Sequence, residues 1–74
     1  MNYLKTLNFG SNILKSNSIK THLIDSELLL AKVLNSKREN ILINLDEQIN
    51  VRNFNYFKEF ILRRKKKEPI AYIL

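Results

Sequence analysis

Apolar residues recur at every third or fourth position along most of the chain, which is the spacing of a helix face and not of a strand. In the first segment this face carries Tyr3, Leu7, Gly10 and Leu14, with Leu4 and Ile13 beside it. A glycine inside a helix costs about 1 kcal/mol relative to alanine and is usual where a second helix approaches closely. The pattern therefore predicts a first helix with a close contact at Gly10, followed by a loop over residues 16–20.

The next apolar segment predicts the central helix of the fold. Thr21 is a predicted N-cap, and Asp25 and Glu27 follow where the helix dipole favours negative charge. The predicted inward stripe consists of Ile24, Leu28, Ala31 and Leu34, widened by Leu29, Leu30 and Val33. We expect a central position because this helix is apolar around much of its circumference. Asn35 then stands where a left-handed C-terminal cap is needed.

Two further helices and a last turn complete the pattern. Ser36-Lys37-Arg38-Glu39 fits a capping box that opens a short helix carrying Ile41, Leu42 and Leu45. Asp46–Asn50 is a polar loop, and Asn50 is the predicted cap of a longer helix over residues 51–66. The inward stripe of that helix is Phe54, Phe57 and Ile61, flanked by Phe60 and Leu62. Pro69 fits the first position of a final helical turn, Ile70–Leu74.

The predicted fold class is all-α: a small bundle of four helices plus a short fifth C-terminal helical turn, forming one domain over residues 1–74. One proline and one glycine are too few for the turns of an all-β chain. The chain has no cysteine and a single histidine, His22, so thiolate and His-based metal sites are excluded. The longest apolar run, Ile70–Leu74, is far shorter than the roughly 20 residues of a membrane span. Without a signal peptide pattern, we expect a cytoplasmic protein.

The sequence offers no complete catalytic site. A nucleotide-type cofactor usually needs a glycine-rich turn, which the single mid-helix Gly10 does not provide. Asp46 and Glu47 are interpreted as solvated loop acids, and His22 as a surface or cap-associated imidazole. No set of nucleophile, base and orienting residue can be assembled. We therefore expect no catalytic residue, no cofactor site and no metal site in this chain.

Positive charge is concentrated near the C-terminus. The net charge is +6, and residues 51–74 contribute seven Lys/Arg against two Asp/Glu. The run consists of Arg63, Arg64, Lys65, Lys66 and Lys67. It would attract an anionic partner, either a nucleic-acid backbone or an acidic protein face. Alternatively, it complements the dipole at a helix C-terminus, or it reflects an AT-rich genome that favours Lys, Asn and Ile codons.

Two segments resemble a known family. They run from Asp25 to Leu34, followed by Ser36-Lys37-Arg38, and from Arg63 to Leu74, which contains Arg-Arg and then Glu-Pro-Ile-Ala-Tyr. They are similar to the N-terminal domain of the peptide chain release factor glutamine methyltransferases, the HemK/PrmC family. Leu7, Phe9, Gly10 and Leu14 also match it. The chain departs from the family pattern at Ser26 for Ala, and at Asn35 and Lys67 for Gly.

The resemblance implies an intact enzyme that transfers a methyl group from S-adenosylmethionine to the glutamine of the Gly-Gly-Gln motif in class 1 release factors. The family's catalytic Asn-Pro-Pro-Tyr motif needs two prolines, whereas this chain has Pro69 alone. We therefore expect the methyltransferase domain, with its cofactor site, beyond Leu74. The chain itself would recognise or position the release factor without being catalytic.

The partner-contact candidates are the basic residues Arg63–Lys67, although Arg63 and Arg64 would serve equally to brace the linker or the methyltransferase domain. A small basic nucleic-acid-binding module is the alternative function. It is less favoured, because no tyrosine alternates with the basic run as a stacking platform would require. A folding unit that acts only as a spacer is a third possibility.

Overall fold

The computed structural model describes all 74 residues and contains five helices. They are α1 (Tyr3–Ser16), α2 (His22–Leu34), α3 (Arg38–Leu42), α4 (Val51–Lys65) and α5 (Ile70–Ile73). The all-α class and the predicted order of four helices and a fifth turn are confirmed. Helices α4 and α5 each end one residue earlier than predicted, which is the usual uncertainty at a helix end.

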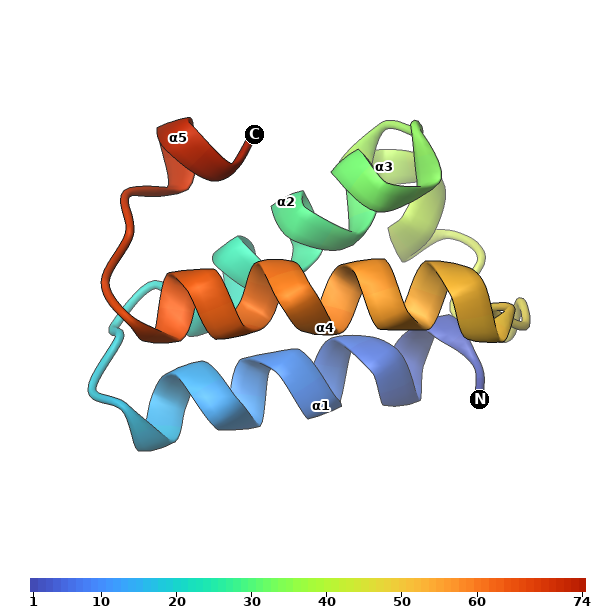
Figure 1. Ribbon diagram of the computed structural model, residues 1–74. Helices are drawn as coiled ribbons and strands as arrows, with labels where there is room; N and C mark the ends of the chain where they lie inside the picture. The colour runs from blue at the N-terminus through green and yellow to red at the C-terminus, as the bar shows by residue number, and fades with distance from the viewer.

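Helices α1 and α4 lie side by side and run in the same direction, with α2 behind them (Figure 1). Helix α3 lies beyond the end of α2, and α5 folds back from the end of α4 (Figure 1). Helix α2 contacts α1, α3 and α4, which confirms its predicted central position. The apolar residues with no exposed surface are Leu14, Leu29, Leu30, Phe57 and Ile61.

Side chains of α2 and α4 pack directly against the backbone of α1 at Gly10, as its mid-helix position predicts. A Cβ atom added there would lie 2.6 Å from Phe57 Cζ and 2.8 Å from both Ile61 Cδ1 and Ser26 Oγ. All three neighbours are buried, so they have little room to move. The hydroxyl of Ser26 donates a hydrogen bond to the Leu7 carbonyl at 2.8 Å, which satisfies it inside the core.

The predicted inward stripe of α2 is wrong at its start. Ile24 is 41% exposed, whereas Asp25 and Ser26, which lie outside the predicted stripe, are buried. On a helix that is apolar around much of its circumference, hydrophobicity alone does not fix the buried face. Here the polar pair is buried because Ser26 bonds to α1 and Asp25 forms an ion pair with α4.

Helices α1, α2 and α4 all end in a Schellman motif, in which a left-handed residue follows the helix. The residues with positive φ are Ser18 (63°), Asn35 (50°) and Lys67 (72°). In each case the backbone N–H of this residue donates to the carbonyl three positions back. The N–H of the next residue donates to the carbonyl five positions back. The left-handed cap predicted at Asn35 is confirmed. Two of the three positions, Asn35 and Lys67, are those where the family pattern has glycine.

Of the three predicted N-caps, Thr21 and Asn50 are confirmed in position, and Ser36 is wrong. The Thr21 side chain makes no cap hydrogen bond, because its hydroxyl donates to Asp25 Oδ2 at 2.7 Å. The capping box at Ser36 does not form: Ser36 N–H closes the Schellman motif on Ala31, and α3 starts one residue later than the box requires. Asn50 caps α4 by accepting from Asn53 N–H at 2.7 Å.

Some flanking residues contribute less to the core than the pattern predicts. Leu45 lies beyond the end of α3, where it is partly buried. Leu4 and Leu62 are 45% and 39% exposed. The Phe57 and Ile61 stripe is confirmed as core, and Phe54 packs beside it against Phe9 with ring centroids 5.2 Å apart.

The first residues of the chain pair with the loop before α4. Asn2 and Gln48 form an isolated antiparallel bridge, and the Met1 carbonyl accepts from Ile49 N–H at 2.9 Å. Tyr3 N–H donates to the Glu47 carbonyl at 2.8 Å. These bonds fix the start of α1 beside the start of α4. None of the five helices combines the length and the apolar character required to cross a membrane.

Candidate functional site

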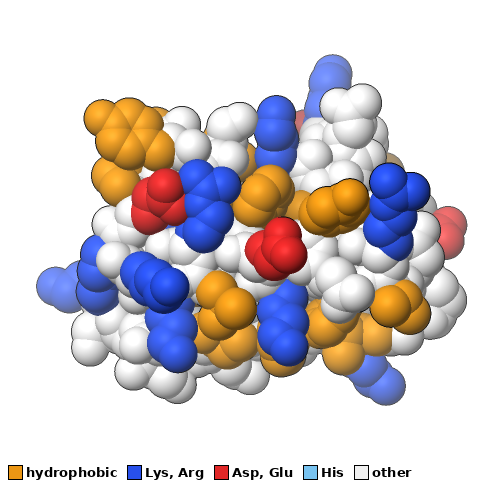
Figure 2. Space-filling view, in the orientation of Figure 1, with side chains coloured by type: hydrophobic (Ala, Val, Ile, Leu, Met, Phe, Trp, Pro, Cys, Tyr) orange, Lys and Arg blue, Asp and Glu red, His pale blue; other side chains and the backbone are white.

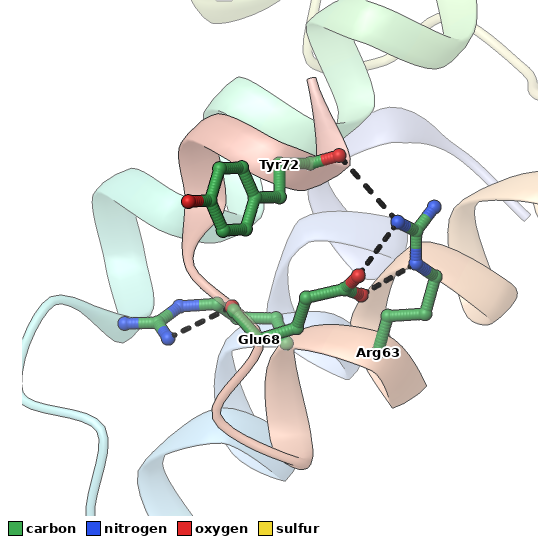
Figure 3. Close-up of polar contacts among 4 residues, drawn as sticks. Arg63, Glu68 and Tyr72 are labelled. Carbon is green, nitrogen blue, oxygen red and sulfur yellow. Dashed lines mark hydrogen bonds and ion pairs between the residues drawn. The ribbon is translucent and has the colours of Figure 1, made fainter.

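The basic run lies at the end of α4 and in the turn that leads to α5, where its two arginines make contacts within the chain. Arg63 donates to both carboxylate oxygens of Glu68, at 2.6 and 2.9 Å, and makes a long contact of 3.5 Å with the Tyr72 carbonyl (Figure 3). The hydrogen bonds from Arg63 lower the pKa of the Glu68 carboxyl and raise the pKa of the guanidinium. Arg63 thus joins α4 to both ends of the α5 segment.

Arg64 makes the more buried of the two arginine contacts. Its Nε donates to Asp25 Oδ2 at 2.9 Å, and Nη1 donates to the Glu68 carbonyl at 3.2 Å. The Arg64 and Asp25 side chains are 19% and 6% exposed. The same carboxylate oxygen of Asp25 accepts from Thr21. This cluster joins α2, α4 and the turn before α5.

Lys67 adds a third connection at this end of the molecule. Its backbone adopts the left-handed conformation of the Schellman motif, and its ammonium group donates to the Asn17 carbonyl at 2.6 Å. That contact spans 50 positions in sequence and brings the α4–α5 turn against the α1–α2 loop. Lys67 therefore places a cation over the neighbouring loop.

Lys65 and Lys66 differ from their neighbours, because both are exposed and make no ion pair or side-chain hydrogen bond. Figure 2 shows that Lys and Arg side chains gather at the left end of the molecule, where α1 and α4 finish. The five partner-contact candidates therefore fall into two kinds. Arg63, Arg64 and Lys67 have partners within the chain, whereas Lys65 and Lys66 have none.

The sequence did not reveal the partners of the basic run. These partners precede the basic run by about 40 to 50 positions in sequence, and only the fold brings them to the end of α4. They are Asn17, Thr21 and Asp25. The five-residue spacing from Arg63 to Glu68 could have predicted their ion pair, because a Schellman motif folds the chain back over the last turn of the helix.

His22 and the loop acids are not brought together with the basic run into a catalytic arrangement. His22 Nδ1 lies 2.7 Å from Ser11 Oγ in a half-buried hydrogen bond between α2 and α1. Asp46 and Glu47 are exposed in the loop at the opposite end of α4. No three His, Cys, Asp or Glu side chains lie close enough to hold a metal ion.

These features define the class of protein: a small all-helical domain whose last helix is fixed to the bundle by arginine contacts. The sequence matches the family model of the PrmC N-terminal domain over residues 5–74, and the chain belongs to this family. The resemblance seen in the two motifs is thereby confirmed.

The relatives are methyltransferases. The chain is 36% identical over 70 residues to the release factor glutamine methyltransferase of Leptospira interrogans, covering 95% of this chain and 24% of that protein. It is 43% identical over 65 residues to the release factor glutamine methyltransferase of Clostridium botulinum, covering 88% and 23%. It is 39% identical over 70 residues to a bifunctional methyltransferase of Rickettsia felis, covering 95% and 13%. The chain thus spans a quarter or less of the length of these relatives. No solved structure matches it significantly.

Proposed function

We propose that this chain is the substrate-positioning domain of a release factor glutamine methyltransferase. The observation that carries the proposal is the family match over residues 5–74, together with relatives named as release factor glutamine methyltransferases. In this proposal a methyltransferase domain that binds S-adenosylmethionine follows Leu74. This chain holds the class 1 release factor while the glutamine of its Gly-Gly-Gln motif reaches that domain.

The contacts at the end of α4 support two roles in this proposal. Arg63 and Arg64 fix α5, the last element before the proposed catalytic domain, so they act as positioning residues. The exposed ammonium groups of Lys65 and Lys66 are available to an acidic surface of the release factor. Within Arg63–Lys67, the residues proposed to contact the release factor are therefore mainly the lysines.

Deletion of residues 1–74 from the full-length methyltransferase tests the proposal. Methyl transfer is measured on an intact release factor and on a short peptide that contains Gly-Gly-Gln. Loss of a docking surface raises KM for the release factor by at least about tenfold, a loss of 1.4 kcal/mol in binding. The peptide reaches only the catalytic domain, so its kcat/KM stays unchanged. Unchanged turnover of the release factor would instead indicate a spacer and contradict the proposal.

Cofactor binding provides an independent check. We expect the isolated chain to give no calorimetric signal with S-adenosylmethionine, and the full-length protein to give one. A signal from the isolated chain would show that the cofactor site had been assigned to the wrong part of the protein.

A further inference from the structure

The lysines that surround the end of α4 are not confined to the basic run. Lys15 lies in the last turn of α1 and Lys20 in the α1–α2 loop, and both line an open pocket of about 350 Å³ beside His22. The bond from Lys67 to the Asn17 carbonyl joins this loop to the α4–α5 turn. The surface so formed, here named the lysine corner, consists of Lys15, Lys20, Lys65, Lys66 and Lys67.

No carboxylate neutralises the lysine corner. All three ion pairs of the chain are formed by arginines, and none of the nine lysines takes part in one. The two acids that reach this end, Asp25 and Glu68, are already paired with Arg64 and Arg63. The ammonium groups of the lysine corner therefore have no carboxylate partner within the chain.

Helix dipoles do not account for this arrangement. Lys15 and Lys65 lie in last helical turns, where a cation is favourable. Lys20, however, lies just before the start of α2, whose positive dipole end disfavours a cation. The dipole of α2 therefore does not stabilise the charge of Lys20, and no carboxylate of the chain pairs with it.

The first turn of α2, which follows Lys20 closely in the chain, presents two exposed apolar side chains. Leu23 and Ile24, in the first turn of α2, are 60% and 41% exposed. Protein interfaces combine an apolar centre with a polar rim, whereas interfaces with nucleic acid are much more positively charged and more polar. No aromatic side chain lines the pocket or stacks on its lysines. These observations favour a protein partner over a nucleic acid.

We infer that the lysine corner, with Leu23 and Ile24, docks an acidic segment of the release factor that also presents an apolar side chain. This inference rests on the proposed function and extends the contact surface from the basic run to the α1–α2 loop. Complementary charge speeds association and sets orientation, while the exposed leucine and isoleucine provide apolar contact.

A charge reversal with a matched control tests the inference on the full-length methyltransferase. The test variant is Lys15→Glu/Lys20→Glu, and the control is Lys32→Glu/Lys37→Glu. The two pairs are equivalent in position, because Lys15 and Lys32 lie in last helical turns and Lys20 and Lys37 precede helix starts. At about 0.1 M salt we expect the test variant to raise KM for the release factor about tenfold, and the control to change it less than about twofold. The difference in KM between the test and control variants becomes smaller at about 0.5 M salt, because screening of the charges is stronger.

Further variants separate docking from a folding defect and from an effect of charge alone. Lys15→Gln/Lys20→Gln removes charge without reversing it and is expected to give a smaller rise in KM. Leu23→Ser is expected to raise KM with little dependence on salt, whereas Val51→Ser, at a residue 77% exposed on α4, leaves KM unchanged. For every variant, kcat/KM for the Gly-Gly-Gln peptide stays at the wild-type value.

The outcomes distinguish this inference from the proposed function. If deletion of residues 1–74 raises KM but the Lys15/Lys20 reversal does not, the domain docks the release factor by another face and the inference is overturned. If deletion has no effect, the proposed function itself fails. Equal effects of test and control reversals overturn the inference as well. A 20-base-pair RNA duplex provides the last outcome. If the wild-type protein binds this duplex, and the test reversal abolishes that binding without changing KM for the release factor, the partner is nucleic acid and the inference is overturned.

Discussion

Arg64 and Asp25, which are 39 positions apart in sequence, are joined by a hydrogen bond of 2.9 Å between Nε and Oδ2. The carboxylate is 6% exposed, so its charge is stabilised mainly by Arg64 and by the Thr21 hydroxyl. Removing one member of such a pair leaves a buried charge without its partner, which is more costly than the net value of the pair.

We therefore predict that Arg64→Met, which keeps the aliphatic stem, lowers the free energy of unfolding by about 2 kcal/mol. Urea denaturation followed by circular dichroism measures the change. The matched control is Arg63→Met, which breaks an ion pair exposed to solvent and has a much smaller effect. Equal effects of the two substitutions would contradict the assignment of Arg64 as the buried contact.

Gly10 gives the second prediction. Alanine is the better helix former by about 1 kcal/mol, yet Gly10→Ala is expected to destabilise the chain by about 1–3 kcal/mol. Its Cβ would meet Phe57 Cζ at 2.6 Å and Ile61 Cδ1 at 2.8 Å. Thermal denaturation compares it with Asn8→Ala on the exposed side of α1, which is expected to be neutral or slightly stabilising. A stabilised Gly10→Ala variant would show that α4 can move away from α1 at no cost.

Lys67 gives the third prediction, because its φ of 72° is unfavourable for any side chain that has a Cβ atom. We expect Lys67→Gly to be more stable than Lys67→Ala by about 1 kcal/mol, since both lose the contact with Asn17 and only glycine relieves the backbone. Chemical denaturation of the two variants gives the difference directly. If they have the same stability, the turn must adopt another conformation.

Glu68 gives a prediction on pH. Hydrogen bonding to Arg63 lowers the pKa of its carboxyl in the folded chain. The ion pair therefore contributes fully above the unfolded-state value of about 4.3 and is lost as the pH falls through the lowered folded value. NMR titration is expected to show the Glu68 carboxyl protonating below the unfolded-state value of a glutamate, with the α5 amide signals shifting at the same pH. In Arg63→Met the titration returns to the ordinary range. A Glu68 carboxyl that titrates at the unfolded-state value in the wild type would contradict the contact.

Sequence patterns predicted the parts of this fold that depend on local chemistry. The stripe of Phe57 and Ile61, the cap at Asn50 and the left-handed Asn35 all follow from residue type and spacing. The close contact at Gly10 was also predictable, because a glycine in an apolar helix face has few other uses.

The errors arose where one residue had two possible partners. Thr21 bonds to Asp25 and not to the free N–H groups of α2, and Ser36 ends α2 and does not begin α3. Buried Asp25 was assigned to the helix dipole, because its partner Arg64 lies too far away in sequence to be recognised. Arg63–Lys67 form one continuous run of contact candidates, and the sequence also predicts Arg63 and Arg64 as braces for the linker or the methyltransferase domain. Only three-dimensional contacts separate Arg63, Arg64 and Lys67, which have partners within the chain, from the unpaired Lys65 and Lys66.

The attachment of α5 has a consequence for the dynamics of the chain. The hydrogen bonds of Met1 and Tyr3 to the loop before α4 close the first four helices into one unit, whereas α5 packs mainly on α4. Beyond the turn, α5 depends on the burial of Ile73 and on the side chain of Arg63. Segments with few buried apolar contacts open locally at a lower free energy than the whole domain. The amides of α5 should therefore exchange with solvent deuterium well before those of α1, α2 and α4, through an opening in which the rest of the bundle stays folded.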